Sequence, residues 1–236
     1  MALKRKLPGR TAGAVITNLL LAAIAAGLFL ALNSPGAQTL AASSPAGPGT
    51  VYRGRDERRV SLVCVVSWNA SACESILGTL SRQGGSMTFA VGAEFAAENS
   101  ELLRKMRETG QDIALCCEGD AKNDLGAAAE ELRRTLQLVS GACGAAPRAF
   151  VCGKDTDAAA CRAARALGLT VVAGSCDLVC VRGTAAEIAA RAKTVRGGDV
   201  AVCAPTAAFA EALPRILEYY SGMGLTAASL SGTIYD

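Results

Sequence analysis

A short apolar run in the middle of the chain delivers thiol and carboxylate side chains in a pattern suited to metal binding. Residues 112–115 read DIAL, and CCEGD follows directly at residues 116–120. Thiolates and carboxylates bind divalent metals, and α/β proteins place such groups at the carboxyl ends of their strands. The chain holds no histidine, so it has no imidazole ligand and no imidazole acid or base. The segment therefore has the layout of a metal site without the usual histidines.

The thiols near this segment leave two interpretations open. A metal site would combine Cys116 and Asp120 with Cys64 or Cys203 from neighbouring strands. No two cysteines have the C-x-x-C spacing that is typical of structural zinc sites. Cys64, Cys152 and Cys203 lie within apolar runs, where cysteine acts as a small hydrophobic residue. Buried thiols are thus the simpler interpretation for most of them.

Disulfides are a third possibility for the cysteines. The chain has ten of them, an even number, and an exported protein lies in a compartment where disulfides persist. Beyond the adjacent Cys116 and Cys117, the closest pair along the chain is Cys176 and Cys180. One or two bridges are compatible with this sequence.

Short apolar runs and helical patterns alternate from residue 51 onward. Strands are predicted at residues 60–66, 86–91, 112–115, 148–152, 169–173 and 199–203, with a weaker one near 225–230. Helices are predicted at residues 71–82, 99–109, 123–140, 156–167, 184–194 and 207–222. Such alternation with near-continuous apolar strands is typical of a parallel sheet covered by helices. The pattern predicts an α/β domain, either doubly wound or a barrel.

The N-terminal part has the pattern of a membrane anchor. Residues 12–32 are uncharged and apolar, and about twenty such residues are enough for a helix to cross a bilayer. Because basic residues lie within residues 1–11 and the following flank is uncharged, the N-terminus is predicted to be cytoplasmic and the domain extracytoplasmic. A cleaved signal peptide is the alternative, since small residues follow the run. Residues 33–50, rich in Ser, Pro, Gly and Ala, are predicted to form a flexible linker to a domain at 51–236.

Composition excludes two classes of protein. With 51% hydrophobic and 19% charged residues, the chain is too apolar to be disordered. The net charge is only +3 and 4% of the residues are aromatic, whereas nucleic-acid binding requires a basic face interleaved with aromatic side chains. No nucleic-acid partner is expected.

Four segments carry a resemblance to a known family. They read VCVVSWN at 63–69, MTFAVGA at 87–93, NSELLRKMRETGQDIALCCEGD at 99–120 and GDVAVCAPT at 198–206. Their order and spacing resemble the polysaccharide deacetylase (NodB homology, carbohydrate esterase) family. The corresponding family motifs are T-F-D-D-G or D-V-x-W-G, A-T-F-F-V-x-G, G-H-E-I-x-x-H-x-x-x-H and H-P-T. The W-G and H-P-T variants are similar to the sporulation-associated branch.

The resemblance implies a fold and a reaction. The fold is a distorted (β/α) barrel of about seven parallel strands, with its site at the C-terminal strand ends. The reaction is metal-dependent removal of an N- or O-acetyl group from a polysaccharide, the N-acetyl case being hydrolysis of a non-peptide carbon–nitrogen bond. A carboxylate and two imidazoles hold the ion, a second carboxylate is the general base, and another histidine is the acid.

The residues for these roles are replaced in this chain. The two family aspartates align with Val65 and Val66, the two histidine ligands with Cys116 and Asp120, and the late histidine with Ala204. Valine and alanine can neither bind a metal nor transfer a proton. The resemblance therefore implies a catalytically inactive pseudoenzyme without a cofactor. The alternative is an active metal-dependent carbohydrate deacetylase in which Cys116 and Asp120 hold Zn²⁺ or another divalent ion.

Three residues are candidates for contact with a glycan. Trp68 and Asn69 align with the W-G of the first motif, and Trp68 either stacks on a sugar ring or closes the strand end by packing. Asp177 belongs to the segment that resembles the family's W-S-x-D, where it either lines the cleft or caps a loop. A cell-wall glycan or an envelope protein is therefore the expected partner, in addition to the membrane.

Overall fold

The computed structural model describes residues 47–67, 70–117, 124–153, 156, 158–179 and 183–235. Within these ranges no helix has the length and apolar character needed to cross a bilayer. The predicted span at 12–32 and the predicted cytoplasmic segment 1–11 lie outside the described residues, as does most of the predicted linker.

The described strands form one sheet in which every neighbouring pair is parallel. The strands are β1 (Arg59–Val66), β2 (Thr88–Val91), β3 (Asp112–Leu115), β4 (Ala149–Cys152), β5 (Thr170–Ala173), β6 (Cys176–Asp177), β7 (Val200–Cys203) and β8 (Thr226–Ala228). They follow the order β5-β4-β3-β2-β1-β7-β6. The longer strand β1 pairs with β2 along its C-terminal half and with β8 along its N-terminal half.

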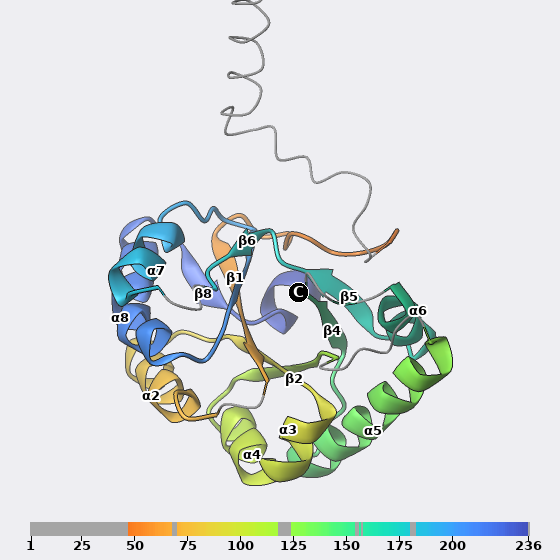
Figure 1. Ribbon diagram of the computed structural model, residues 1–236. Coiled ribbons are helices and arrows are strands. Elements are labelled where there is room, and N and C mark those ends of the chain that lie inside the picture. The colour runs from red at the N-terminus through yellow and green to blue at the C-terminus, as the bar shows by residue number, and fades with distance from the viewer. Residues whose placement is uncertain are drawn as a thin grey trace, which may run out of the picture. The chain divides into compact units, whose positions relative to one another are not determined.

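Helices surround these strands, as Figure 1 shows. They are α2 (Cys73–Gln83), α3 (Ala93–Glu98), α4 (Ser100–Glu108), α5 (Leu125–Cys143), α6 (Ala158–Ala166), α7 (Ala185–Ala192) and α8 (Ala207–Gly222), followed by the π-helix η1 (Ser231–Tyr235). A strand followed by a helix, repeated around a ring, is the arrangement of a (β/α) barrel. The predicted parallel barrel is therefore confirmed.

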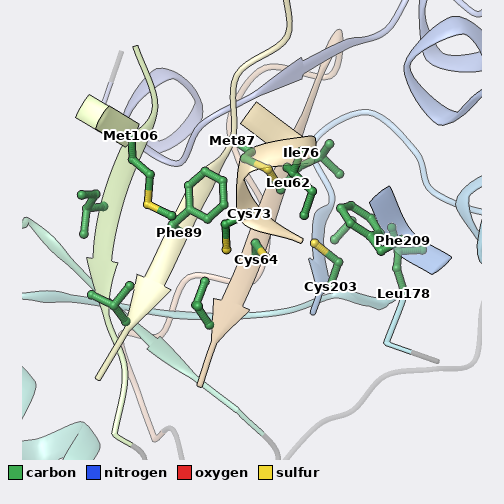
Figure 2. Packing of buried hydrophobic residues seen from close by; sticks show 14 of the residues in the cluster. Leu62, Cys64, Cys73, Ile76, Met87, Phe89, Met106, Leu178, Cys203 and Phe209 are labelled. Carbon is green, nitrogen blue, oxygen red and sulfur yellow. The ribbon is translucent and has the colours of Figure 1, made fainter. Parts of the chain in front are cut away.

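Side chains of β1 alternate between two separate cores. Leu62, Cys64 and Val66 point outward into the layer between the strands and the helices. Figure 2 shows this outer layer, where Phe89 of β2 packs near Met106 of α4. The intervening Val63 points into the barrel instead. Since successive strand side chains point to opposite faces, both faces of this sheet are apolar and buried.

The interior of the barrel is filled rather than open. Small and branched side chains line it, and Leu230 and Ile234 from the end of the chain complete the cluster. Hydrogen bonds hold this C-terminal segment to the strands, among them Ser61 Oγ to Thr233 Oγ1 at 2.6 Å, Leu230 N to Thr88 Oγ1 at 2.8 Å, and Ser231 Oγ to Asp112 Oδ2 at 2.7 Å. These contacts lie at the N-terminal ends of β1, β2 and β3, so η1 closes that end of the barrel, as its central position in Figure 1 shows.

The segment at residues 51–54 links the edge strand β5 to the far side of the sheet. Val51 forms two backbone hydrogen bonds with β5, to Val171 and Ala173 at 2.9 Å each. Gly54 donates its N–H to the Gly198 carbonyl at 2.7 Å, just before β7. Residues 51–54 therefore bridge β5 and the start of β7.

The buried carboxylate of Asp199 stabilises this link between residues 51–54 and the start of β7. Asp199 is 4% exposed and accepts hydrogen bonds from Arg53 Nη1 at 2.5 Å, Arg196 N at 2.8 Å and Ser175 Oγ at 3.1 Å. A buried carboxylate costs stability unless it is paired and hydrogen-bonded, and Asp199 meets both conditions. The Arg53 contact connects residues that are far apart in the sequence.

Three described elements, β6, α3 and η1, were not predicted from the sequence, and the weak C-terminal strand was predicted too long. Strand β6 has two residues, which is too short for any periodicity to show. Helix α3 is separated from α4 by Asn99, whose side chain donates to the Phe95 carbonyl at 3.0 Å and ends the first helix. The weak strand near 225–230 is shorter in the structure, because the chain leaves β8 after Ala228 for η1.

Candidate functional site

The residues that align with the family's catalytic positions lie at one end of the barrel. Val65 and Val66 end β1, and Cys116 follows β3. The parallel register pairs Val66 with Val91 of β2, and Cys116 N donates to the Val91 carbonyl at 3.0 Å. Ala204 follows β7, the other neighbour of β1. The structure therefore brings these positions to the same C-terminal edge.

The two valines at the end of β1 point in opposite directions. Val65 is half-buried and packs against the cluster inside the barrel. Val66 is 0% exposed and belongs to the cluster between the strands and the helices. Only the first of the two aligned aspartate positions thus faces the interior of the barrel.

Cys116 contributes one thiol to the interior. It is 5% exposed and packs in the inner cluster with Val63, Ala90 and Ala114. Its neighbour Cys117 is half-buried and packs against the outer cluster. The sequence placed both cysteines at this strand end but could not show that they face different layers.

The A-P-T segment at residues 204–206 starts a helix. Thr206 N donates to the Ala204 carbonyl at 2.8 Å, and Thr206 Oγ1 accepts the Phe209 N–H at 3.1 Å. Threonine in this position caps the first turn of α8. Ala204 itself is half-buried and brings no polar side chain to the site.

Among the candidates for glycan contact, the structure describes Asp177. Its Oδ1 accepts the Val179 N–H at 2.8 Å, which supports the loop-cap interpretation. Asp177 lies on β6 and pairs with Val202 of β7, so it is at the same edge as Ala204. Trp68, Asn69 and Asp120 lie outside the described residues.

Solved structures share this arrangement of strands and helices. A family 4 carbohydrate esterase pseudoenzyme from Bacillus anthracis is similar with a TM-score of 0.71 and 16% identity, over 79% of this chain and 69% of that chain. A mutant of that pseudoenzyme with restored enzymatic activity is similar with the same TM-score of 0.71 and 16% identity, over 79% and 71%. The family 4 carbohydrate esterase from Streptomyces lividans, in complex with acetate, has a TM-score of 0.66 and 23% identity, over 73% and 92%.

The fold is that of the family 4 carbohydrate esterases. The predicted resemblance to polysaccharide deacetylases is confirmed at this level. No protein-family model matches the sequence, and no curated protein matches it in sequence either. The likeness therefore rests on the three-dimensional arrangement.

The resemblance implies a divalent ion at this edge, but the described side chains at the aligned positions do not fit one. Val65, Val66 and Ala204 have no donor atom, which leaves the Cys116 thiol as the one donor that the structure describes at the aligned positions. Four ligands with a defined geometry are the usual requirement of a zinc site. Over the described ranges, no group of three or more Cys, Asp or Glu side chains is arranged to hold a metal.

Three cysteines of the outer layer, Cys64, Cys73 and Cys203, behave as buried apolar residues. Burial raises the pKa of the Cys64 thiol well above its usual value, and the adjacent Cys203 raises it further. Burial also raises the pKa of the Cys73 thiol to about 12. Figure 2 shows the three side chains together in the outer layer of the esterase fold. A thiol that stays protonated is a poor metal ligand and a poor nucleophile.

A separate cavity lies at the opposite end of the barrel. It has a volume of about 390 Å³ and is lined by residues at the starts of β3 and β4, among them Gln111, Asp112 and Arg148. Asp112 is already engaged, since Ser231 donates to it through Oγ and N. The candidate site is at the C-terminal strand ends, and this cavity is at the N-terminal strand ends. The cavity is therefore not part of the candidate site.

Proposed function

We propose that this protein is a membrane-anchored, extracytoplasmic polysaccharide deacetylase-like protein that does not deacetylate. It instead binds a cell-envelope glycan or an envelope protein at the C-terminal strand ends. The observation that carries the proposal is the set of side chains at those ends: Val65 and Ala204 at aligned catalytic positions, and Val66 turned into the helix layer.

The chemistry of acetyl removal explains why these substitutions matter. An amide carbonyl must be polarised and a water molecule deprotonated, and in this family a metal ion and a carboxylate base supply those two functions together. The chain has no histidine to replace either group. A glycan can still be bound by shape, by hydrogen bonds and by an aromatic face, none of which needs a metal.

Loss of activity on this fold has a precedent among the similar structures. The protein from Bacillus anthracis is itself a pseudoenzyme, and a mutant of it has restored enzymatic activity. This supports the view that the fold persists in a protein without enzymatic activity. The Cys116 and Asp120 metal site is the alternative, and it would need further ligands besides these two side chains.

Binding of a glycan is expected to depend on Trp68, which contacts the sugar ring. Full-length protein is expected to pellet with insoluble peptidoglycan, and Trp68→Ala is expected to reduce the pelleted fraction several-fold, because an aromatic face is the main apolar surface that a sugar ring can contact. The matched control is Tyr235→Ala, an aromatic residue at the other end of the barrel. Equal pelleting of both variants and the unmodified protein would exclude Trp68 from the binding surface. No pelleting of the unmodified protein would favour a protein partner.

The anchor predicts a defined topology. Protease added to intact cells is expected to digest residues 51–236, whereas a segment that includes residues 12–32 stays with the membrane. Permeabilised cells are the control for protease activity. Protection of the domain in intact cells would contradict export, and release of the whole domain without protease would indicate a cleaved signal peptide.

A further inference from the structure

Two thiols face each other where β4 leads into α6. Cys152 is the last residue of β4, and Cys161 lies in the first half of α6. The Cys161 thiol donates to the Cys152 sulfur across 3.3 Å. Neither cysteine is more than 5% exposed. We propose that Cys152 and Cys161 form a disulfide in an oxidising environment, which links the end of β4 to α6.

The surroundings of Cys152 favour its reactive form. The hydrogen bond from Cys161 lowers the pKa of the Cys152 thiol, and Thr156 and the Arg165 guanidinium lower it further. Burial and the neighbouring Cys117 act in the opposite direction, but the net change is downward. Because the thiolate is the attacking species in disulfide chemistry, Cys152 is the nucleophile of this pair.

The two cysteines are close in sequence as well as in space. Gly153 N, next to Cys152, donates to Thr156 Oγ1 at 2.8 Å, and α6 begins at Ala158. To form the bridge, the two sulfurs must close from 3.3 Å to a bond of about 2 Å. Gly153, which follows Cys152, is exposed, so this end of β4 lies next to the surface.

A second pair of neighbouring cysteines, Cys64 and Cys203, lies in an environment that does not favour a disulfide. Cys64 and Cys203 lie on adjacent strands and are 0% exposed. Their environment raises the pKa of Cys64, and the Cys203 thiol donates to the Val63 carbonyl at 3.4 Å. Cys152 and Cys161 are close together, and the pKa of Cys152 is lowered. Cys64 and Cys203 are also close together, but the pKa of Cys64 is raised.

The oxidant is a small disulfide such as oxidised glutathione. The Cys152 thiolate attacks one of its sulfurs, the glutathione disulfide bond breaks, and one glutathione thiolate leaves and takes up a proton. Cys161 then gives its proton to solvent and displaces the second glutathione as a thiolate, which is protonated in turn. Two protein thiols become one disulfide, and one oxidised glutathione, which accepts two electrons, becomes two reduced molecules.

Tryptic mapping tests the bridge directly. Cleavage after Lys154 and Arg162 places the two cysteines in separate peptides, residues 149–154 and 155–162. Full-length protein is incubated with oxidised glutathione, alkylated with iodoacetamide and digested. The expected product is the two peptides joined, two hydrogens lighter than their sum and separated again by dithiothreitol. Cys64 and Cys203 are expected to be alkylated after denaturation and never joined.

Thermal unfolding gives a second test of the same oxidation. Oxidation is expected to raise the thermal midpoint by roughly 5 °C, because the bridge restricts the unfolded chain. Cys152→Ser and Cys161→Ser should each abolish the shift, and Cys143→Ser, a half-buried cysteine in α5, should keep it. Persistent glutathione on Cys152, a bridge from Cys152 to Cys117, or alkylation of both thiols after oxidation would each overturn the proposal. Mapping of the unmodified protein decides the matter even if a variant fails to fold.

Discussion

Val66→Asp is expected to lower the free energy of unfolding by about 4 kcal/mol, whereas Val65→Asp should lower it by about 1 to 2 kcal/mol. Val66 is fully buried against the helices, so the substitution loses its apolar burial and places a carboxylate among apolar side chains. Val65 is half-buried at the open edge of the barrel, where water can reach a charge. Since a domain of this kind has about 5 to 15 kcal/mol of total stability, the first variant is close to the limit of folding.

Urea unfolding of the fragment Pro45–Asp236, which forms a compact unit, measures the two free energies. Val66→Asn is the matched control, because it removes the same apolar contacts without adding a charge. The gap between Asp and Asn at position 66 should shrink as the pH falls, since burial raises the pKa of the carboxyl and it then keeps its proton. Equal losses for Val65→Asp and Val66→Asp would contradict the opposite orientations of the two side chains.

The orientation of Val66 also limits how activity could be regained. An aspartate at position 65 would face the barrel interior beside Cys116, and one at position 66 would start out facing the helices. Restoring the second carboxylate would therefore require the end of β1 to shift. A restored site in this chain would depend on changes around the strand end as well as on the substituted residues.

Much of the fold could be predicted from the sequence because its strands are nearly continuous apolar runs. Residues 112–115 and 207–222 were predicted with the bounds that the structure has. Each of these elements is defined by its own composition, by an apolar run in the strand and by periodicity and a threonine cap in the helix. Local signals of this kind need no knowledge of distant contacts.

The closure of the barrel could not be predicted in this way. The bonds of Val51 to β5 and of Arg53 to Asp199 join segments that are more than a hundred residues apart. No local pattern marks such a contact. Gly197 illustrates the same limit, because a side chain there would lie 1.5 Å from the Glu57 carbonyl oxygen, a restriction that only the folded chain reveals.

The sequence could predict which strand end each residue of the candidate site occupies, but not which face of the sheet its side chain points to. Alignment of the motifs placed Val65, Val66, Cys116 and Ala204 at strand ends, and the structure confirms that they share one edge. Which of them face the interior follows from the pleat of each strand and its pairing. The neighbouring thiols of Cys152 and Cys161 were likewise hidden, because a strand end and a helix meet there only after folding.

Acetate release is the most direct test of the proposed loss of catalysis. Full-length protein is incubated with N-acetylglucosamine oligomers or peptidoglycan in the presence of zinc or cobalt, with an active polysaccharide deacetylase as the positive control. No acetate above the protein-free background is expected, because Val65, Val66 and Ala204 supply neither metal ligand nor proton acceptor. Metal-dependent acetate release that Cys116→Ala or Asp120→Ala abolishes would contradict this account and establish the chain as an enzyme with thiolate and carboxylate ligands.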